Sequence, residues 1–415
     1  MTSVSLPVAE LAPAATRAGH WRERALYTAT LLLTALFWLP QAIRWMDDSD
    51  FGPHGEDVVR TLDSLWWVIT NIPHFLFQAL SAGVVRLLNV DVPMAMAIVI
   101  TLATLTLGAV LFVVFRRALA GDHALTWPQG ALVMGAVLAL LVVAPLAFFN
   151  AENLYFGFFA PNVYHNPTVN LMKPSAVALF FAGLACFHPA WRPRPLPLWM
   201  LGYILLTAIC LFSKPNFIIA WLPPMALATL YFMARRRPIH WALLIGGIVL
   251  PAGLLLFIQT QTWTGGAGIE ISPFEIYDLW ALHYEPTANQ DLLLKHAASI
   301  VFPLLVYLLY LPQAARSLTF NVAWLTFFVG AAYVDLLIDR SNPTAGDFMW
   351  GAQFGVFLLF MAALLLLLRQ MRAHGWRDPR LLLVGLALAA HLFAGANWYY
   401  LHLTRPYLQL IYIWW

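Results

Sequence analysis

Charged residues are scarce in this chain. Only 10% of its 415 residues are Asp, Glu, Lys or Arg, whereas 61% are hydrophobic. A soluble domain carries roughly 25% charged residues, and a soluble fold this apolar would expose patches that promote aggregation. The composition therefore excludes an ordinary soluble protein and predicts a chain that is solvated by a lipid bilayer.

Other features are missing as well. The two cysteines, Cys186 and Cys210, stand within apolar runs, which predicts buried thiols and no disulfide framework. The net charge is only +3 and no basic patch is interleaved with aromatics, so we expect no nucleic-acid partner. The sequence contains no P-loop, GxGxxG, HExxH or CxxC motif. The absence of a nucleotide motif fits chemistry outside the cytoplasm, where nucleotides are scarce.

Long apolar runs are abundant instead. A spanning helix needs roughly 20 apolar residues, and we expect an all-α, polytopic transmembrane protein with about eleven spans. The expected spans are 25–45, 93–115, 130–149, 174–187, 197–212, 217–233, 240–259, 298–311, 322–337, 350–368 and 381–396. They form a single transmembrane domain, residues 25–415, that follows a cytoplasmic N-terminal segment, residues 1–24.

The basic residues predict the orientation of the chain. Most of the 23 Lys and Arg residues fall in short alternate loops, and the positive-inside rule makes those loops cytoplasmic. These basic loops lie at residues 17–24, 116–117, 192–194, 235–237, 316 and 369–380. The N-terminus is then cytoplasmic and the C-terminus lies outside.

The longest loops are expected on the outer side, at residues 46–92, 150–173 and 261–296. Functional residues tend to lie in loops that a rigid scaffold holds, so we expect the working face on this side. Within the first loop, residues 65–88 are apolar but are interrupted by polar residues such as His74. A span there would invert every later loop, so we expect one or two amphipathic helices in the outer interface.

An acidic cluster follows the first expected span. It contains Asp47, Asp48 and Asp50, with His54 close behind. Carboxylates at this position can act as a general base or bind a metal ion. Alternatively, they belong to a solvated loop that ends the helix.

Two further groups of polar residues stand on the outer side. The loop 150–173 combines aromatic side chains with His165, Asn166 and Lys173, which suits a sugar-like ligand or, alternatively, an interfacial aromatic belt. Lys214 lies between two expected spans, where a lysine can hold a lipid phosphate or snorkel from a helix end.

Asp335 falls near the outer end of a span. An acid is costly there and is therefore a functional candidate. A pairing with Arg340 is the structural alternative.

The layout resembles the GT-C superfamily of membrane glycosyltransferases. The resemblance rests on the segments WMDDSDFGPHGED and IPHFLFQALSAGVVRLL, and also on YHNPTVNLMKP and SKPNF. It covers residues 25–235, mostly as layout. It implies a GT-C-like fold with interfacial helices in the first outer loop, located in the inner (cytoplasmic) membrane of a bacterium with a periplasmic or extracellular active face.

The resemblance also implies a reaction. An enzyme of this kind takes a sugar from a polyprenyl-phosphate donor and passes it, with inversion, to a glycan or lipid acceptor. The general base would be Asp47, Asp48 or Asp50, and we favour Asp50 because DFGPH places His54 near the same cleft. No cofactor is expected beyond the lipid-linked donor, and a divalent metal is compatible with the carboxylates but is not indicated by them.

The binding residues are expected on the outer side. The carrier phosphate requires cations, and the candidates are Lys173, Lys214, Arg340 and Arg405. Histidines and an amide complete the predicted binding set: His54, His74, His165 and Asn166. We expect the cleft between the segment around Asp50 and the aromatic loop around His165.

Two other classes of protein stay open. A multi-pass transporter or lipid flippase would place polar residues at mid-span and pair broken helices. The expected spans are nearly free of mid-span charge, although Pro145 and the pair Pro223 and Pro224 can break helices. A non-catalytic scaffold that contacts membrane lipids would explain the aromatic loops but not the acidic cluster. The sequence favours no particular oligomeric state.

Overall fold

The computed structural model describes residues 17–45, 50–147, 155–189, 191, 194–262 and 268–405. The described chain is almost entirely helical, and its strands form one two-stranded sheet. Ten of the described helices are long and apolar enough to cross a membrane. The chain is therefore a multi-pass helical membrane protein, as its composition predicts.

Each of these ten helices coincides with an expected span. They are α1 (Arg17–Trp45), α5 (Val92–Ala120), α7 (Pro167–Ala185), α8 (Leu196–Ser213), α9 (Asn216–Ala234), the continuous pair η1 (Ala242–Val249) and α10 (Leu250–Thr262), α12 (Leu292–Leu309), α14 (Leu318–Leu336), α15 (Met349–His374) and α16 (Arg380–Thr404). The first eight residues of the sixth span, Ala242–Val249, form a π-helix.

The remaining expected span, 130–149, corresponds to α6 (Trp127–Val142), which has only 16 residues. Thr126 and Gln129 form a capping box that fixes its first turn,. The helix ends at Val142, and the chain continues without regular structure to Ala147. The total of about eleven spans therefore stays a prediction.

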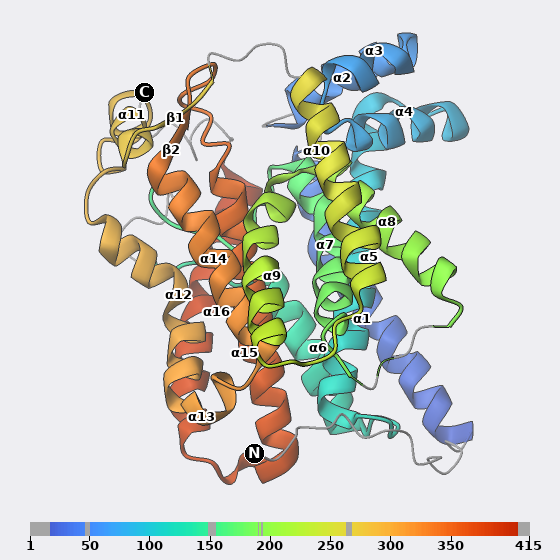
Figure 1. Cartoon of the computed structure of the whole chain (residues 1–415), viewed down its shortest axis with the longest axis vertical. Coiled ribbons are helices and arrows are strands. Elements are labelled where there is room, and N and C mark those ends of the chain that lie inside the picture. Colours follow the sequence, from blue (N-terminus) through green and yellow to red (C-terminus); the bar gives the residue numbers. More distant parts are fainter. Residues whose placement is uncertain are drawn as a thin grey trace.

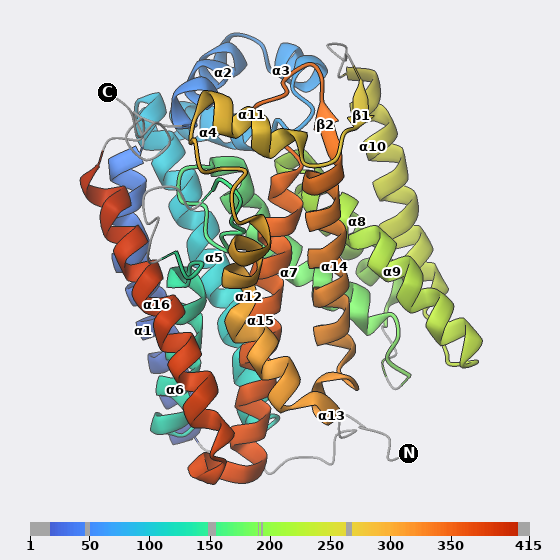
Figure 2. The same cartoon turned by 90° about the vertical axis from the view of Figure 1, so that its left-hand side faces the viewer.

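The non-spanning elements are concentrated at one end of the bundle (Figures 1 and 2). This loop-rich end carries α2 (Phe51–Asp63), α3 (Leu65–Asn71), α4 (Leu76–Leu88), β1 (Ile269–Ile271), α11 (Glu275–His283) and β2 (Leu337–Asp339). The strands are antiparallel, with Glu270 opposite Ile338. The short helices α13 (Leu311–Ala314) and η2 (Gly375–Arg377) lie at the opposite end.

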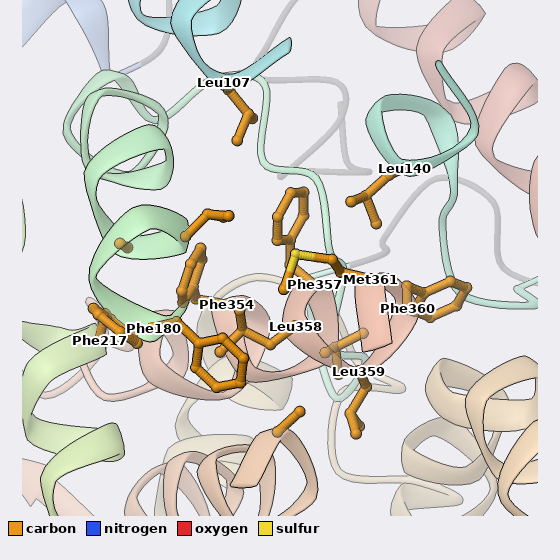
Figure 3. Packing of buried hydrophobic residues seen from close by; sticks show 14 of the residues in the cluster. Leu107, Leu140, Phe180, Phe217, Phe354, Phe357, Leu358, Leu359, Phe360 and Met361 are labelled. Atoms are coloured by element: carbon orange, nitrogen blue, oxygen red, sulfur yellow. The ribbon is translucent and has the colours of Figure 1, made fainter. Parts of the chain in front are cut away.

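Helix α15 is the core of the bundle. It is apolar on every side and is buried along its membrane-spanning window, as expected for a helix with neighbours all round. Figure 3 shows its phenylalanines pointing toward different neighbours. Phe354 packs against Phe217 of α9, at 4.9 Å between ring centroids, and Phe360 packs against Phe302 of α12 at 5.5 Å. Helices α5, α6, α7, α9, α12 and α14 therefore pack around α15.

The segment 155–166 enters this bundle without regular structure, and all of its residues are buried. Irregular backbone is tolerated at such depth only where protein groups satisfy it. The main-chain N–H of Phe159 donates to Ser299 Oγ (2.9 Å), and Asn162 Nδ2 donates to the carbonyls of Leu140 and Val143 (both 3.0 Å). The described part of the expected outer loop 150–173 is thus interior structure.

Helix α7 also begins earlier than expected, at Pro167 instead of Pro174. Asn166 accepts a hydrogen bond from the main chain of Val169 and caps the helix,. Pro167 occupies the first helical position, where a missing N–H costs nothing. Lys173 therefore lies within the helix and not in the preceding loop.

Candidate functional site

Asp50 and Asn166 meet where two helices begin. Asp50 precedes α2 and its side chain makes no capping hydrogen bond there. Asn166 uses its Oδ1 to cap α7, and its Nδ2 donates to Asp50 Oδ2 (2.9 Å). His165 Nε2 lies 4.0 Å from the same carboxylate oxygen. The segment around Asp50 and the segment around His165, between which the sequence predicts a cleft, therefore meet at one carboxylate.

His54 stands one turn after Asp50 on α2. Gln78 Nε2 of α4 donates to His54 Nδ1 (3.0 Å), so the proton of a neutral His54 ring is on Nε2. Burial lowers the pKa of His54 to about 4; nearby Asp50 opposes this shift and Lys214 adds to it. The ring is therefore neutral at pH 7, and it lies within the electrostatic reach of both an acid and a lysine.

His74 belongs to the same neighbourhood. Burial lowers the pKa of its imidazole well below the usual range, and the positive charge of Lys214 and the nearby His54 ring add to this shift. A side chain of another helix holds the turn that carries His74. Gln259 Nε2 of α10 donates hydrogen bonds to the carbonyls of Pro73 (2.6 Å) and Leu211 (3.0 Å). This turn therefore links α4, α8 and α10.

Lys214 supplies the positive charge of the site. It follows α8 in an extended conformation and is only 7% exposed. Its Nζ lies 3.9 Å from Asp347 Oδ1 and 5.5 Å from the ring centroid of Trp350. Asn216 Nδ2 donates to the carbonyl of Asp347 (2.6 Å), which holds the acid beside the lysine. We call Asp50, His54, His74, His165, Asn166 and Lys214 the Asp50 cluster.

Aromatic rings enclose His165. The ring centroid of Tyr155 is 4.6 Å away, that of Trp350 is 6.3 Å away, and that of His402 is 6.4 Å away in a stacked arrangement. Tyr155 Oη and His402 Nε2 lie 3.3 Å apart. Burial lowers the pKa of His165 to about 3 and raises that of Tyr155. Both side chains are therefore uncharged near pH 7.

Two of the predicted cations, Lys173 and Arg340, have partners of other kinds. Lys173 Nζ donates to the carbonyl of Pro161 (3.1 Å) and to Asn162 Oδ1 (3.3 Å), so this lysine ties the buried segment 155–166 to α7. The predicted bases Asp47 and Asp48 lie outside the described residues.

Arg340 stabilises the small sheet. Its guanidinium forms two hydrogen bonds with Glu275 (2.6 and 2.9 Å) and a third with Glu270. These contacts lower the pKa of both glutamates. Asp335 therefore does not depend on Arg340; instead it accepts a hydrogen bond from Tyr277 Oη (2.7 Å), with His296 Nε2 at 4.0 Å.

Arg405 is the C-cap of α16. Its carbonyl accepts a hydrogen bond from Arg44 Nη2 (3.0 Å), which ties the end of α16 to the end of α1. His402, one turn earlier, is the residue of α16 that faces His165. The main-chain contact of Arg405 is therefore structural, because it joins two spanning helices.

Several members of the site were not predicted. Gln78, Asp347, Trp350, Tyr155 and His402 all contact the Asp50 cluster. The sequence does mark Gln78, because it is a polar residue that interrupts the apolar run 65–88. Tyr155 is one of the aromatic side chains of the loop 150–173 and lies in the same segment as His165. The other three follow from tertiary contacts over long sequence separations, and no local pattern identifies them.

The arrangement combines a carboxylate, a buried ammonium group and neutral imidazoles. A carboxylate can accept a proton from a hydroxyl group, and an ammonium group can bind a phosphate as a point charge. Among the described residues, no group of three or more His, Cys, Asp or Glu could hold a metal ion. No protein-family model, curated protein or solved structure matches the chain. Its function is therefore argued from its own residues.

Proposed function

We propose that this protein is a glycosyltransferase that moves a sugar from a polyprenyl-phosphate donor to a glycan or lipid acceptor at its loop-rich end. The observation that carries the proposal is the Asp50 carboxylate, which accepts a hydrogen bond from Asn166. Both this carboxylate and the ammonium group of Lys214 act electrostatically on His54, so the two charges lie in the same region of the protein. A base for the acceptor and a cation for the leaving phosphate are the two groups that this reaction requires.

In the proposed step, Asp50 accepts the proton of the acceptor hydroxyl. The acceptor oxygen forms a bond to the anomeric carbon while the bond between that carbon and the phosphate oxygen breaks. One displacement inverts the configuration at the anomeric carbon. The polyprenyl phosphate leaves with an additional negative charge, which Lys214 stabilises. The reaction needs no oxidant or reductant.

The neighbouring short helices support a lipid-linked donor. Trp66 of α3 is 73% exposed and Leu87 of α4 is 83% exposed, at the end of the bundle that carries the Asp50 cluster. Exposed apolar residues on short helices are typical of an interfacial position. The predicted orientation, with the N-terminus in the cytoplasm, would place this end outside the cytoplasm.

The test compares two aspartates of the same region. Asp50→Asn should reduce sugar transfer about 100-fold to 10,000-fold, the usual contribution of a general base. Asp57→Asn is the matched control, because Asp57 lies on α2 and pairs with Arg60 at 3.3 Å on the surface. Protein in nanodiscs would be mixed with polyprenyl phosphates that carry labelled hexoses or pentoses, together with envelope glycans and lipids.

Equal transfer by the wild type and Asp50→Asn would contradict the catalytic assignment. The rival function, lipid flipping, is tested in proteoliposomes with the same labelled lipids. A flippase would move label between the leaflets without transferring it to an acceptor. That outcome would replace the proposal.

A further inference from the structure

Gln353 is a polar residue on the buried central helix. It is 1% exposed, and neither its amide oxygen nor its amide nitrogen has a hydrogen-bond partner within the described structure. Trp350, on the preceding turn, is 6% exposed, and its indole Nε1 likewise has no partner there. Buried polar atoms are nearly always paired in folded proteins, so three unpaired atoms on adjacent turns require an explanation.

The position of these atoms relates them to the Asp50 cluster. Trp350, Gln353 and Phe357 occupy positions i, i+3 and i+7 of α15 and therefore share one helix face. The ring of Trp350 faces Lys214 and His165, and the ring of Phe357 lies 5.0 Å from Lys173 Nζ. Gln353 is thus about one helical turn, or roughly 5 Å, deeper in the bundle than Trp350.

The chemistry of the unpaired atoms selects a ligand class. The indole N–H is a donor, and the amide supplies both a donor and an acceptor. None of them is charged, so they match hydroxyl groups, which donate and accept, better than a second phosphate. Aromatic rings beside a few placed polar groups are typical of a site for a small polar ligand.

We propose that Gln353 and Trp350 bind the sugar hydroxyl groups of the donor and determine which sugar is accepted. This inference rests on the proposed function, since it assigns the sugar of the donor to the inner side of the Asp50 cluster. The phosphate lies at Lys214, the sugar extends inward toward Gln353, and the acceptor hydroxyl approaches Asp50.

The experiment measures binding of two probes to protein in nanodiscs. One probe is bare polyprenyl phosphate, and the other is the same lipid carrying glucose, mannose, galactose or arabinose. Gln353→Met should weaken binding of the preferred sugar-bearing lipid about tenfold, the effect of losing one or two hydrogen bonds. Binding of the bare phosphate should stay within twofold of the wild-type value.

Gln370→Met is the matched control. Gln370 lies on the same helix, is 9% exposed, and also has an amide oxygen without a partner in the described chain. It is 17 residues farther along α15, or roughly 25 Å away, so its substitution should leave both affinities unchanged. Trp350→Phe provides a second variant, which keeps a ring beside Lys214 but removes the indole donor, and should weaken only the sugar-bearing probe.

The outcomes separate the two proposals. If the wild type binds neither probe, the proposed function is wrong and this inference falls with it. If the wild type binds both probes and Gln353→Met and Trp350→Phe bind them as tightly, only the sugar assignment is wrong. An equal loss of both probes would also overturn it, because it would mean a general structural effect. Gln353→Met should unfold at the same temperature as the wild type or a higher one, since it buries no unpaired amide.

Discussion

The side chain of Asn166 forms hydrogen bonds at both ends of its amide, and the contributions of the two ends can be separated by substitution. Its Oδ1 accepts a hydrogen bond from Thr168 Oγ1 (2.9 Å). The same oxygen accepts the main-chain N–H of Val169 (3.0 Å) and caps α7, whereas Nδ2 donates to Asp50 Oδ2 (2.9 Å). Serine can cap a helix but is too short to reach Asp50 as well. Alanine provides neither contact. The two variants therefore distinguish the stability of α7 from the orientation of the carboxylate.

The expected loss of free energy can be assigned to each of these contacts. Loss of an N-cap costs about 1 kcal/mol, and a hydrogen bond to a charged group contributes about 1.5–3 kcal/mol. Asn166→Ala should therefore lower the free energy of unfolding by about 2.5–4 kcal/mol if the two effects add. Asn166→Ser should keep the cap and lose only the contact with Asp50, which corresponds to a decrease of about 10-fold to 100-fold in transfer rate.

Two assays in parallel check this prediction. Thermal unfolding in detergent measures the stability of each variant, and transfer from the labelled donor measures its rate. Combining Asn166→Ser with Asp50→Asn provides the control, because the double variant should transfer no more slowly than Asp50→Asn alone if Asn166 acts through Asp50. A wild-type rate for Asn166→Ser, or additive losses in the double variant, would refute the reasoning.

Two further predictions concern charge. Lys214→Gln should weaken binding of bare polyprenyl phosphate about 10-fold to 100-fold, because a charged hydrogen bond is lost. A binding titration measures the affinity, and an unchanged value would mean that the phosphate binds elsewhere. Burial lowers the pKa of His54 from 6.5 to about 4. Between pH 6.5 and pH 4 the unfolded chain therefore binds more protons at this residue than the folded chain does, and the stability of the fold decreases as the pH is lowered,. His54→Asn should flatten this part of the profile, as thermal unfolding at pH 4.5 and 7.5 would measure; an equally steep profile would contradict it.

The spans were predictable because a bilayer imposes a length and a composition on any helix that crosses it. Each of the ten span-length helices coincides with an apolar run of the sequence. Helix boundaries were less accurate where apolarity was the only criterion used. Apolarity alone predicts a start of α7 at Pro174 instead of Pro167, although Asn166 and Pro167 are a recognisable cap and first helical residue,.

The meeting of Asp50 with His165 and Asn166 was also predicted, since all three lie on loops expected on one side of the membrane. The partners of the cations were not. Lys173 binds main-chain and side-chain oxygens of the buried segment 155–166, and Arg340 binds Glu270 of the small sheet and Glu275 of α11. The sequence indicates which side of the membrane a charge faces, but the partner depends on three-dimensional packing that local patterns do not contain.

The Asp50 cluster is assembled from the ends of spanning helices and of one short helix, α2, at the loop-rich end of the bundle. Asp50 precedes α2, Asn166 precedes α7, and Lys214 follows α8. The acid thus stands at a helix N-terminus and the lysine at a helix C-terminus, where the helix dipoles favour these charges. Trp350 lies in the first turn of α15, the most enclosed helix. Because the bundle fixes the ends of these helices and the buried segment 155–166 carries His165, groups separated by more than a hundred residues are held together at the site.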